Sequence, residues 1–165
     1  MKHVLIALLI AAPLCALADS PDVDFYKKAA ESGNEEIELG KLASEKGASE
    51  GVKAFGAMMV KDHGSAGEKL KSIASAKSVD LPTSAGMGGM ATKAKLEVLS
   101  GQTFDKSYIK GQLKAHHDTA DLFSKEVASG HDSEAKAFAK ATLPTVKAHL
   151  KALDKLAAEA GVDTK

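Results

Sequence analysis

Residues 50–77 read EGVKAFGAMMVKDHGSAGEKLKSIASAK, and the spacing of apolar residues in this stretch decides the fold. They recur every three or four positions, at Val52, Phe55, Met59, Ala66, Leu70 and Ile73. An α-helix has about 3.6 residues per turn, so this spacing places them on one helical face. Asp62 and His63 fill the gap in that face. The stretch therefore predicts a helix that turns two polar side chains toward a protein core.

The same spacing recurs along the chain, and glycines and cap residues divide it into helices. We expect long helices over residues 23–46, 50–77, 104–129 and 133–160. Short turns at 47–50 and 130–132 make two antiparallel hairpins. The connection between the hairpins is expected to be a Gly and Met loop at 84–91, followed by a short helix at 93–99. No segment shows sustained period-two alternation, so the sequence predicts an all-α four-helix bundle with a long crossover.

A faint internal repeat supports two related hairpins. A shift of 83 positions aligns Lys-Ala-Phe at 53–55 with Lys-Ala-Phe at 136–138, and Gly47 with Gly130. The repeat is the pattern expected when two helical hairpins are joined by a crossover.

The first 18 residues are interpreted as a secretory signal. Lys2 and His3 provide the positive start, an apolar stretch follows to residue 17, and Ala-Leu-Ala at 16–18 is a small-x-small cleavage site. The apolar stretch is shorter than the ~20 residues that span a bilayer comfortably. A lipoprotein signal at Cys15 and an uncleaved anchor are the rivals. We expect cleavage near Ala18 and one exported, periplasmic or otherwise extracytoplasmic domain over residues 19–165.

The composition of the mature chain excludes several classes of protein. Cys15 is the only cysteine, so no disulfide remains after cleavage, and core packing alone must hold the domain. The chain has 22 basic and 22 acidic residues, and every basic one is lysine. Without the guanidinium forks of arginine or a basic stripe, nucleic acid is not an expected partner. We expect no transmembrane segment in the mature chain, and an envelope protein of unknown identity remains a candidate partner.

One polar group that can bind metal or carry a proton lies on or beside the apolar face of each long helix. These groups are Glu36, His63, His116 and His149. Counting about 1.5 Å per residue from the two turns places all four in one central layer. Three imidazoles and a carboxylate suit zinc, iron or copper, with Asp62 or His117 as a hydrogen-bonding partner of a ligand.

The alternative is a structural polar layer. Histidines beside a helical core commonly hydrogen-bond to a neighbouring side chain or carbonyl, and no cofactor is then needed. Met87 and Met90 could bind soft Cu(I), but methionines in a Gly-rich loop are more often incidental. On this interpretation the protein is a noncatalytic bundle.

Several short motifs, in the same order, resemble an exported ferritin-like family, the domain of unknown function 4142 (DUF4142). They lie at Phe25 with 29–30, 36–43, 52–55, 59–63, 104–108, 116–123, 142–144 and 149–150. The resemblance implies a ferritin-like four-helix bundle in the bacterial periplasm or cell envelope. It implies no settled activity, because fold does not determine function.

The ferritin-like fold invites a di-iron centre, which the sequence argues against. Such centres use Glu-x-x-His motifs, yet Val60 and Val146 stand three residues before His63 and His149. We therefore expect a noncatalytic envelope protein of undetermined role, such as one in stress tolerance. The alternative is a metal-binding or redox protein with a mononuclear His/Glu site.

Overall fold

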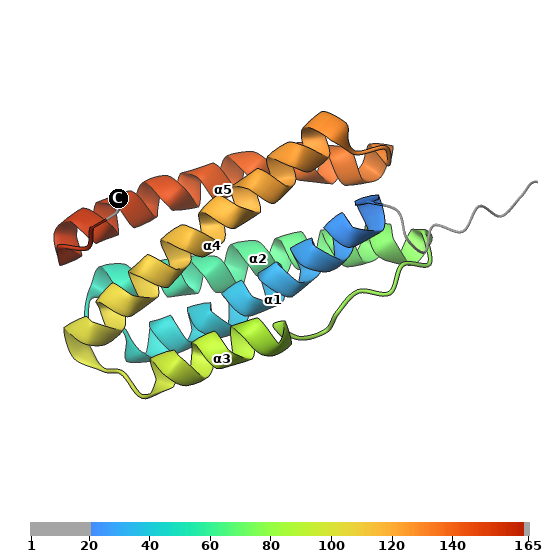
Figure 1. The fold of residues 1–165 in the computed structure, drawn as a ribbon. Helices are drawn as coiled ribbons and strands as arrows, with labels where there is room; N and C mark the ends of the chain where they lie inside the picture. Colours follow the sequence, from blue (N-terminus) through green and yellow to red (C-terminus); the bar gives the residue numbers. More distant parts are fainter. Residues whose placement is uncertain (1–20, 164–165) are drawn as a thin grey trace, which may run out of the picture.

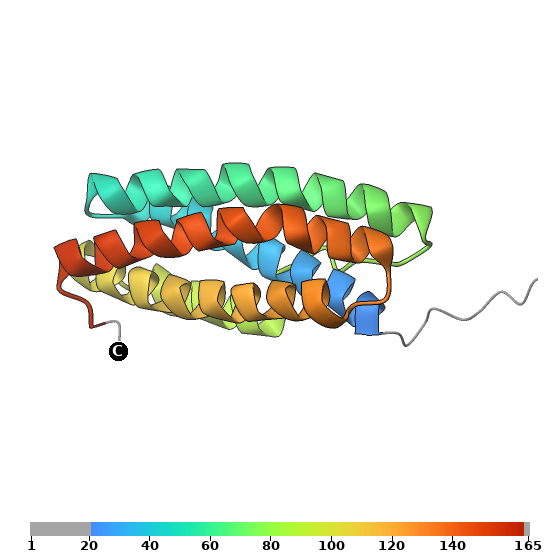
Figure 2. The same ribbon diagram turned by 90° about the horizontal axis from the view of Figure 1, so that it is seen from above.

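The computed structural model describes residues 21–163, and within them helices joined by short loops are the regular secondary structure. Its helices are α1 (Pro21–Lys46), α2 (Glu50–Ala76), α3 (Gly86–Glu97), α4 (Gly101–Ser129) and α5 (Ser133–Ala160). α1 pairs with α2 and α4 with α5 as antiparallel hairpins, and α3 flanks α1 in the crossover (Figure 1). Seen from above, α5 lies beside α2 as well as α4 (Figure 2). The predicted all-α bundle of two hairpins with a helix in the crossover is confirmed.

Two of the sequence predictions concern the signal segment and membrane-spanning helices. The expected signal segment, residues 1–18, lies outside the described residues. Within residues 21–163, none of the helices combines the length and the apolar character needed to cross a bilayer.

The crossover helix begins earlier than the sequence predicts. The expected loop at 84–91 is wrong, because α3 begins at Gly86. Gly86 has φ +62°, a left-handed conformation that glycine adopts without steric cost. A Cβ at Gly89 would lie 3.1 Å from the side chain of Glu35 on α1, so this turn of α3 packs closely on α1. Tertiary packing thus stabilises a helix that glycine propensity disfavours.

Two glycines set the distance between α1 and α2. A Cβ added at Gly56 would lie 2.5 Å from the carbonyl oxygen of Gly40, and one at Gly40 would lie 2.7 Å from that of Gly56. The backbones therefore touch at this crossing, where no side chain fits. Helices held this close bring the polar groups of α1 and α2 toward the same layer.

Each hairpin turn is fastened by a buried aspartate from the other hairpin. Asp105 at the start of α4 accepts a hydrogen bond from the backbone N–H of Ala48, at 2.8 Å. Asp22 at the start of α1 accepts one from the N–H of His131, also at 2.8 Å. The shift of 83 positions carries one contact onto the other. The two hairpins are thus related in their contacts as well as in sequence.

The hydrophobic core consists of two clusters on either side of the polar layer. One cluster includes Met59, Leu113 and Leu153. The other includes Leu70 and Phe123, nearer the opposite end of the bundle. The three histidines lie along their helices between these groups, so water-excluding packing closes the layer above and below.

We expect Gly56→Ala to lower the free energy of unfolding by about 1–3 kcal/mol, because the new methyl group would force the α1 and α2 backbones apart. The matched control is Gly111→Ala on α4, where an added Cβ meets nothing within 4 Å. There we expect no loss, and a gain of up to about 1 kcal/mol from helix propensity. Urea unfolding followed by circular dichroism measures both changes. Equal effects at the two sites would contradict the close-packing account.

Candidate metal centre

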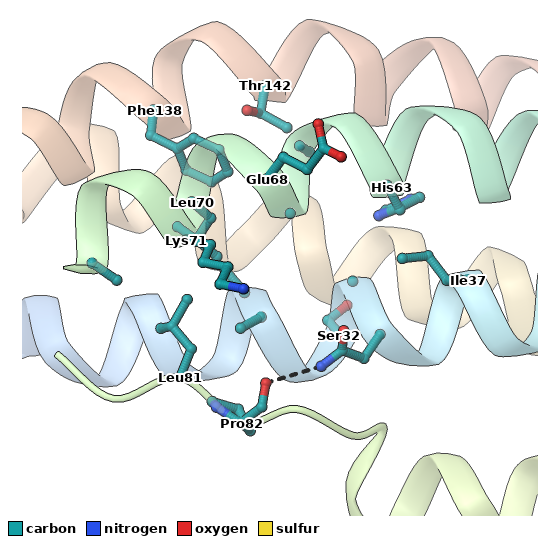
Figure 3. Close-up of a pocket in the computed structure, with 18 of the residues that line it drawn as sticks. Ser32, Ile37, His63, Glu68, Leu70, Lys71, Leu81, Pro82, Phe138 and Thr142 are labelled. Carbon is teal, nitrogen blue, oxygen red and sulfur yellow. Dashed lines mark hydrogen bonds between the residues drawn. The ribbon is translucent and has the colours of Figure 1, made fainter.

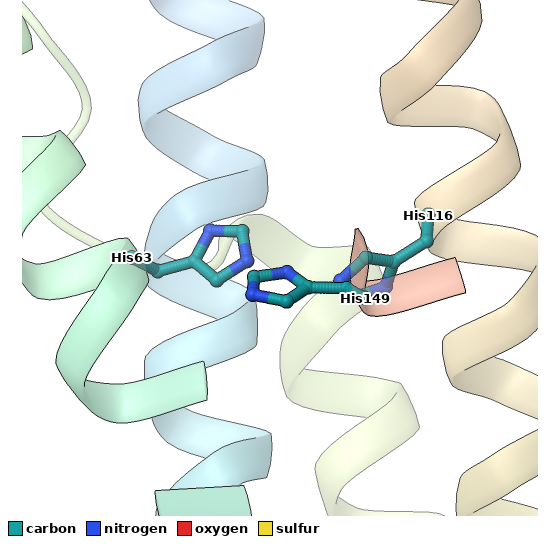
Figure 4. A group of neighbouring side chains, drawn as sticks. All are labelled: His63, His116 and His149. Atoms are coloured by element: carbon teal, nitrogen blue, oxygen red, sulfur yellow. The ribbon is translucent and has the colours of Figure 1, made fainter. Parts of the chain in front are cut away.

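Three histidines from three helices meet in the polar layer. His63 comes from α2, His116 from α4 and His149 from α5, and Figure 4 shows their rings pointing toward one another. One ring nitrogen from each lies within 4.8 Å of the others. The ring centroids are 5.3 to 5.8 Å apart. The expectation that these residues share one axial level therefore agrees with their positions.

The hydrogen bond of His116 fixes where its proton lies. Its Nδ1 is 3.0 Å from the carbonyl oxygen of Gln112, one turn earlier on α4. A carbonyl only accepts, so Nδ1 carries the hydrogen and donates it. In the neutral ring Nε2 is then a bare lone pair. This Nε2 is buried and has no hydrogen-bond partner.

His149 is held in the same way by an acid on α2. Its Nε2 lies 3.1 Å from Oδ2 of Asp62. A carboxylate accepts, so Nε2–H donates and Nδ1 of the neutral ring keeps a bare lone pair. Nδ1 is also buried without a partner. Asp62, expected from the sequence to support a ligand, thus contacts His149, whereas His117 is exposed on the surface of α4.

His63 completes the group from α2. Its Nε2 is buried and has no hydrogen-bond partner, although the residue as a whole is only half-buried. Each of the three rings therefore has one buried nitrogen without a partner. Phe55 packs against His116 and His149, with ring centroids 6.1 Å from each, and forms an apolar wall beside them.

Glu36 lies at the edge of the histidine group. Its Oε1 is 3.9 Å from Nδ1 of His116, which is beyond hydrogen-bond distance, and its Oε2 has no partner. The residue is 1% exposed. Burial raises the pKa of Glu36 to about 8, so the carboxyl group is mostly protonated at neutral pH. The three histidines meet, and the predicted fourth group stands beside His116.

His63 and His116 are neutral imidazoles at neutral pH. Burial lowers the pKa of His63 to about 3 and that of His116 to about 4, and the neighbouring histidines lower both further. A neutral imidazole is the form that binds metal ions. These two rings could therefore bind a metal ion without first losing a proton.

Two further buried polar residues, on the same helix as His116, escaped the sequence analysis. Gln112 and Tyr108 are both 1% exposed, and the Gln112 amide atoms and the Tyr108 hydroxyl have no hydrogen-bond partner. Gln112 precedes His116 by four positions and so shares its helical face. That spacing was the signal that could have identified it.

The donor set fits a single ion better than a di-iron centre. Metal–nitrogen bonds of about 2.0–2.1 Å hold ligand nitrogens about 3.3–3.5 Å apart, so small ring movements would close the observed spacing. Bridging carboxylates are missing at the positions that ferritin-like di-iron proteins use, where Val60 and Val146 stand instead. The residues of this layer do not fit a di-iron cofactor.

Comparisons with known proteins agree on the fold and leave the activity open. The chain shows structural similarity to the "putative secreted protein DUF305" of Streptomyces coelicolor, with 15% identity and a TM-score of 0.76 over 90% of this chain and 98% of that one. It is also similar to a DUF305 fragment from Deinococcus radiodurans, with 11% identity and a TM-score of 0.73 over 85% and 97% of the two chains. At these identities the likeness shows the fold alone.

No curated protein matches the chain. The family model described as "Domain of unknown function (DUF4142)" matches residues 11–156, which is most of the sequence. The resemblance seen in the short motifs is therefore confirmed, and the chain belongs to the DUF4142 family.

Proposed function

We propose that this chain is an exported, noncatalytic metal-binding protein that holds one transition-metal ion between His63, His116 and His149. Of the two functions considered from the sequence, the geometry favours the second, a mononuclear site in the bundle core, over a metal-free bundle. Catalysis is not part of the proposal.

Two buried lone pairs carry the proposal. Nε2 of His116 and Nδ1 of His149 are left as acceptors by the hydrogen bonds of their own rings, and neither meets a donor. A buried polar atom without a partner costs about 1–3 kcal/mol. A single cation shared with His63 would satisfy all three nitrogens at once, because an ion accepts lone pairs from several directions.

The outer contacts of two rings are those of metal ligands. Metal-binding histidines commonly donate their second N–H to a carboxylate or backbone carbonyl, which fixes the ring and raises its basicity. Asp62 and the Gln112 carbonyl occupy those roles for His149 and His116. Imidazole ligands without thiolates suit Zn²⁺, Cu²⁺ and Fe²⁺, and zinc accepts the four-coordinate geometry that a water molecule would complete.

Export is supported by two independent features. The N-terminal sequence has the pattern of a secretory signal, and one structurally similar protein is described as a "putative secreted protein". We also propose that the partner is an envelope protein. This proposal rests only on the expected compartment.

We expect the mature protein, stripped with a chelator and titrated with zinc, to bind one ion per chain. His116→Ala should weaken binding at least about tenfold, because one of three ligands is lost. The control is His117→Ala, which removes a neighbouring exposed imidazole and should leave binding unchanged. Competition with a chromogenic chelator gives the affinity, and circular dichroism checks that both variants fold. Identical binding in all three proteins would contradict the site.

Asp62 should act on the metal through His149. We expect Asp62→Ala to weaken zinc binding by about 10–100-fold without changing the one-to-one stoichiometry, because His149 loses the acceptor that orients it. Asp62→Asn, which can still accept through its amide oxygen, should lose less. The same titration tests both. Unchanged affinity in Asp62→Ala would show that the contact does not support a ligand.

The metal-free protein should contain two different histidine tautomers. We expect His116 to carry its hydrogen on Nδ1 and His149 on Nε2, as their acceptors require. Long-range ¹H–¹⁵N correlation spectra of ¹⁵N-labelled protein distinguish the two forms, with single histidine variants to assign the signals. An Nε2–H tautomer at His116 would remove the lone pair from the centre of the layer.

A further inference from the structure

We propose that the metal ion reaches and leaves the three histidines through a cavity between α1, α2 and the crossover segment, and that His63 is the ligand that moves to let it pass. This inference rests on the proposed function, because it concerns the exchange of the same ion.

His63 differs from the other two ligands in how its ring is held. His116 and His149 each donate their second N–H to an acceptor, the Gln112 carbonyl and Asp62. Within residues 21–163, neither ring nitrogen of His63 has a hydrogen-bond partner. A ring without such a bond changes its side-chain rotamer at lower cost than one that must break it. Of the three ligands, His63 is therefore the one that turns aside most easily.

His63 is also the ligand nearest to solvent. His116 and His149 are 1% and 2% exposed, whereas His63 is half-buried. Phe55 closes one side of the layer by packing against the His116 and His149 rings, and the two hydrophobic clusters close it above and below. An ion that approaches the layer from the side of His63 thus meets the least packing.

The inner end of the cavity lies next to the histidine group. His63 lines it, together with Thr119, three positions after His116, and Val146, three positions before His149. Three positions are about one helical turn, so each ligand helix contributes to this end. Nε2 of His63 points toward the other two rings (Figure 4), while the same residue forms part of the cavity wall. The His63 ring therefore stands between the cavity and the layer.

The cavity is large enough for a hydrated ion and opens to the surface. Its volume is about 510 Å³. Six waters at about 30 Å³ each, the hydration shell of a divalent ion, occupy roughly 180 Å³. Exposed Glu68, Lys71 and Asp80 line it, so it is in contact with solvent, and two of these three charges are negative. Figure 3 shows His63 and Ile37 at one end of this lining, with Leu81 toward the other.

Glycines leave the room that a moving ring needs. Gly33 on α1 and Gly64 and Gly67 on α2 line the cavity, and a Cβ added at any of them would meet nothing within 4 Å. Gly67 lies one helical turn after His63 and so shares its side of α2. Glycine inside a helix costs stability relative to alanine, and here it keeps open the space beside His63.

We expect Gly33→Leu, which puts a side chain into the cavity, to slow zinc release and zinc uptake by similar factors of at least about ten. The equilibrium affinity should stay within about twofold, because the leucine obstructs the route and replaces no ligand. The matched control is Gly111→Leu, at an open position on α4 outside the cavity, which should change neither rate.

Stopped-flow mixing of the zinc-loaded mature chain with excess chromogenic chelator gives the release rate constant. Equilibrium competition gives the dissociation constant, and the quotient of the two is the uptake rate constant. Circular dichroism checks folding, and Gly67→Leu provides the same test should Gly33→Leu fail to fold.

Release from Gly33→Leu as fast as from the wild type, or equal slowing in Gly111→Leu, would overturn the cavity as the route. A loss of affinity with unchanged uptake would count against it as well. A wild type that binds no zinc would overturn the proposed function and this inference together, whereas tight zinc binding with unaltered exchange in Gly33→Leu would overturn this inference alone.

A second measurement tests the role of His63 in the metal-free chain. We expect NMR relaxation dispersion of the ring signals to show microsecond-to-millisecond exchange for His63 and none for His116 and His149, whose rings are held by acceptors. Zinc should suppress the exchange of His63. Equal rigidity of all three rings, or exchange confined to His116 or His149, would overturn His63 as the moving ligand.

Discussion

A buried imidazole needs a partner for each of its nitrogens, and this requirement organises the centre of the bundle. One nitrogen each of His116 and His149 is satisfied by an acceptor, which leaves the other as a lone pair in an environment that excludes water. Hydrophobic clusters on both sides close the layer. In this setting an unsatisfied acceptor is costly, and a cation that binds three nitrogens removes the cost.

The bundle that holds this layer is built from two related hairpins. Equivalent aspartates fasten the two turns, so the hairpins share their architecture. Positions related by the shift of 83 have diverged in the central layer, where His63, His116 and His149 correspond to Val146, Gly33 and Ala66. Both hairpins therefore contribute imidazoles and smaller side chains. Two related hairpins thus build one polar centre to which both contribute.

Much of this architecture could be predicted because it depends on local patterns. Apolar spacing and cap residues predict the four long helices, and counting residues from the turns predicts that His63, His116 and His149 lie at one level. The start of α3 could not be predicted, since it depends on packing of Gly89 against α1 rather than on propensity. The choice of Asp62 as the partner of His149, and the position of Glu36 beside His116, depend on how helices rotate against each other. The cavity next to His63 lies between segments that are far apart in the sequence, so local sequence patterns do not predict it.

The most direct test of the central claim is the crystal structure of the zinc-loaded mature protein, with anomalous diffraction measured on both sides of the zinc absorption edge. The account predicts one anomalous peak in the polar layer, bound by Nε2 of His63, Nε2 of His116 and Nδ1 of His149, with Asp62 still bonded to His149. Zinc found only at surface sites, with the three rings unmoved and water between them, would contradict it and leave the histidines as a structural layer.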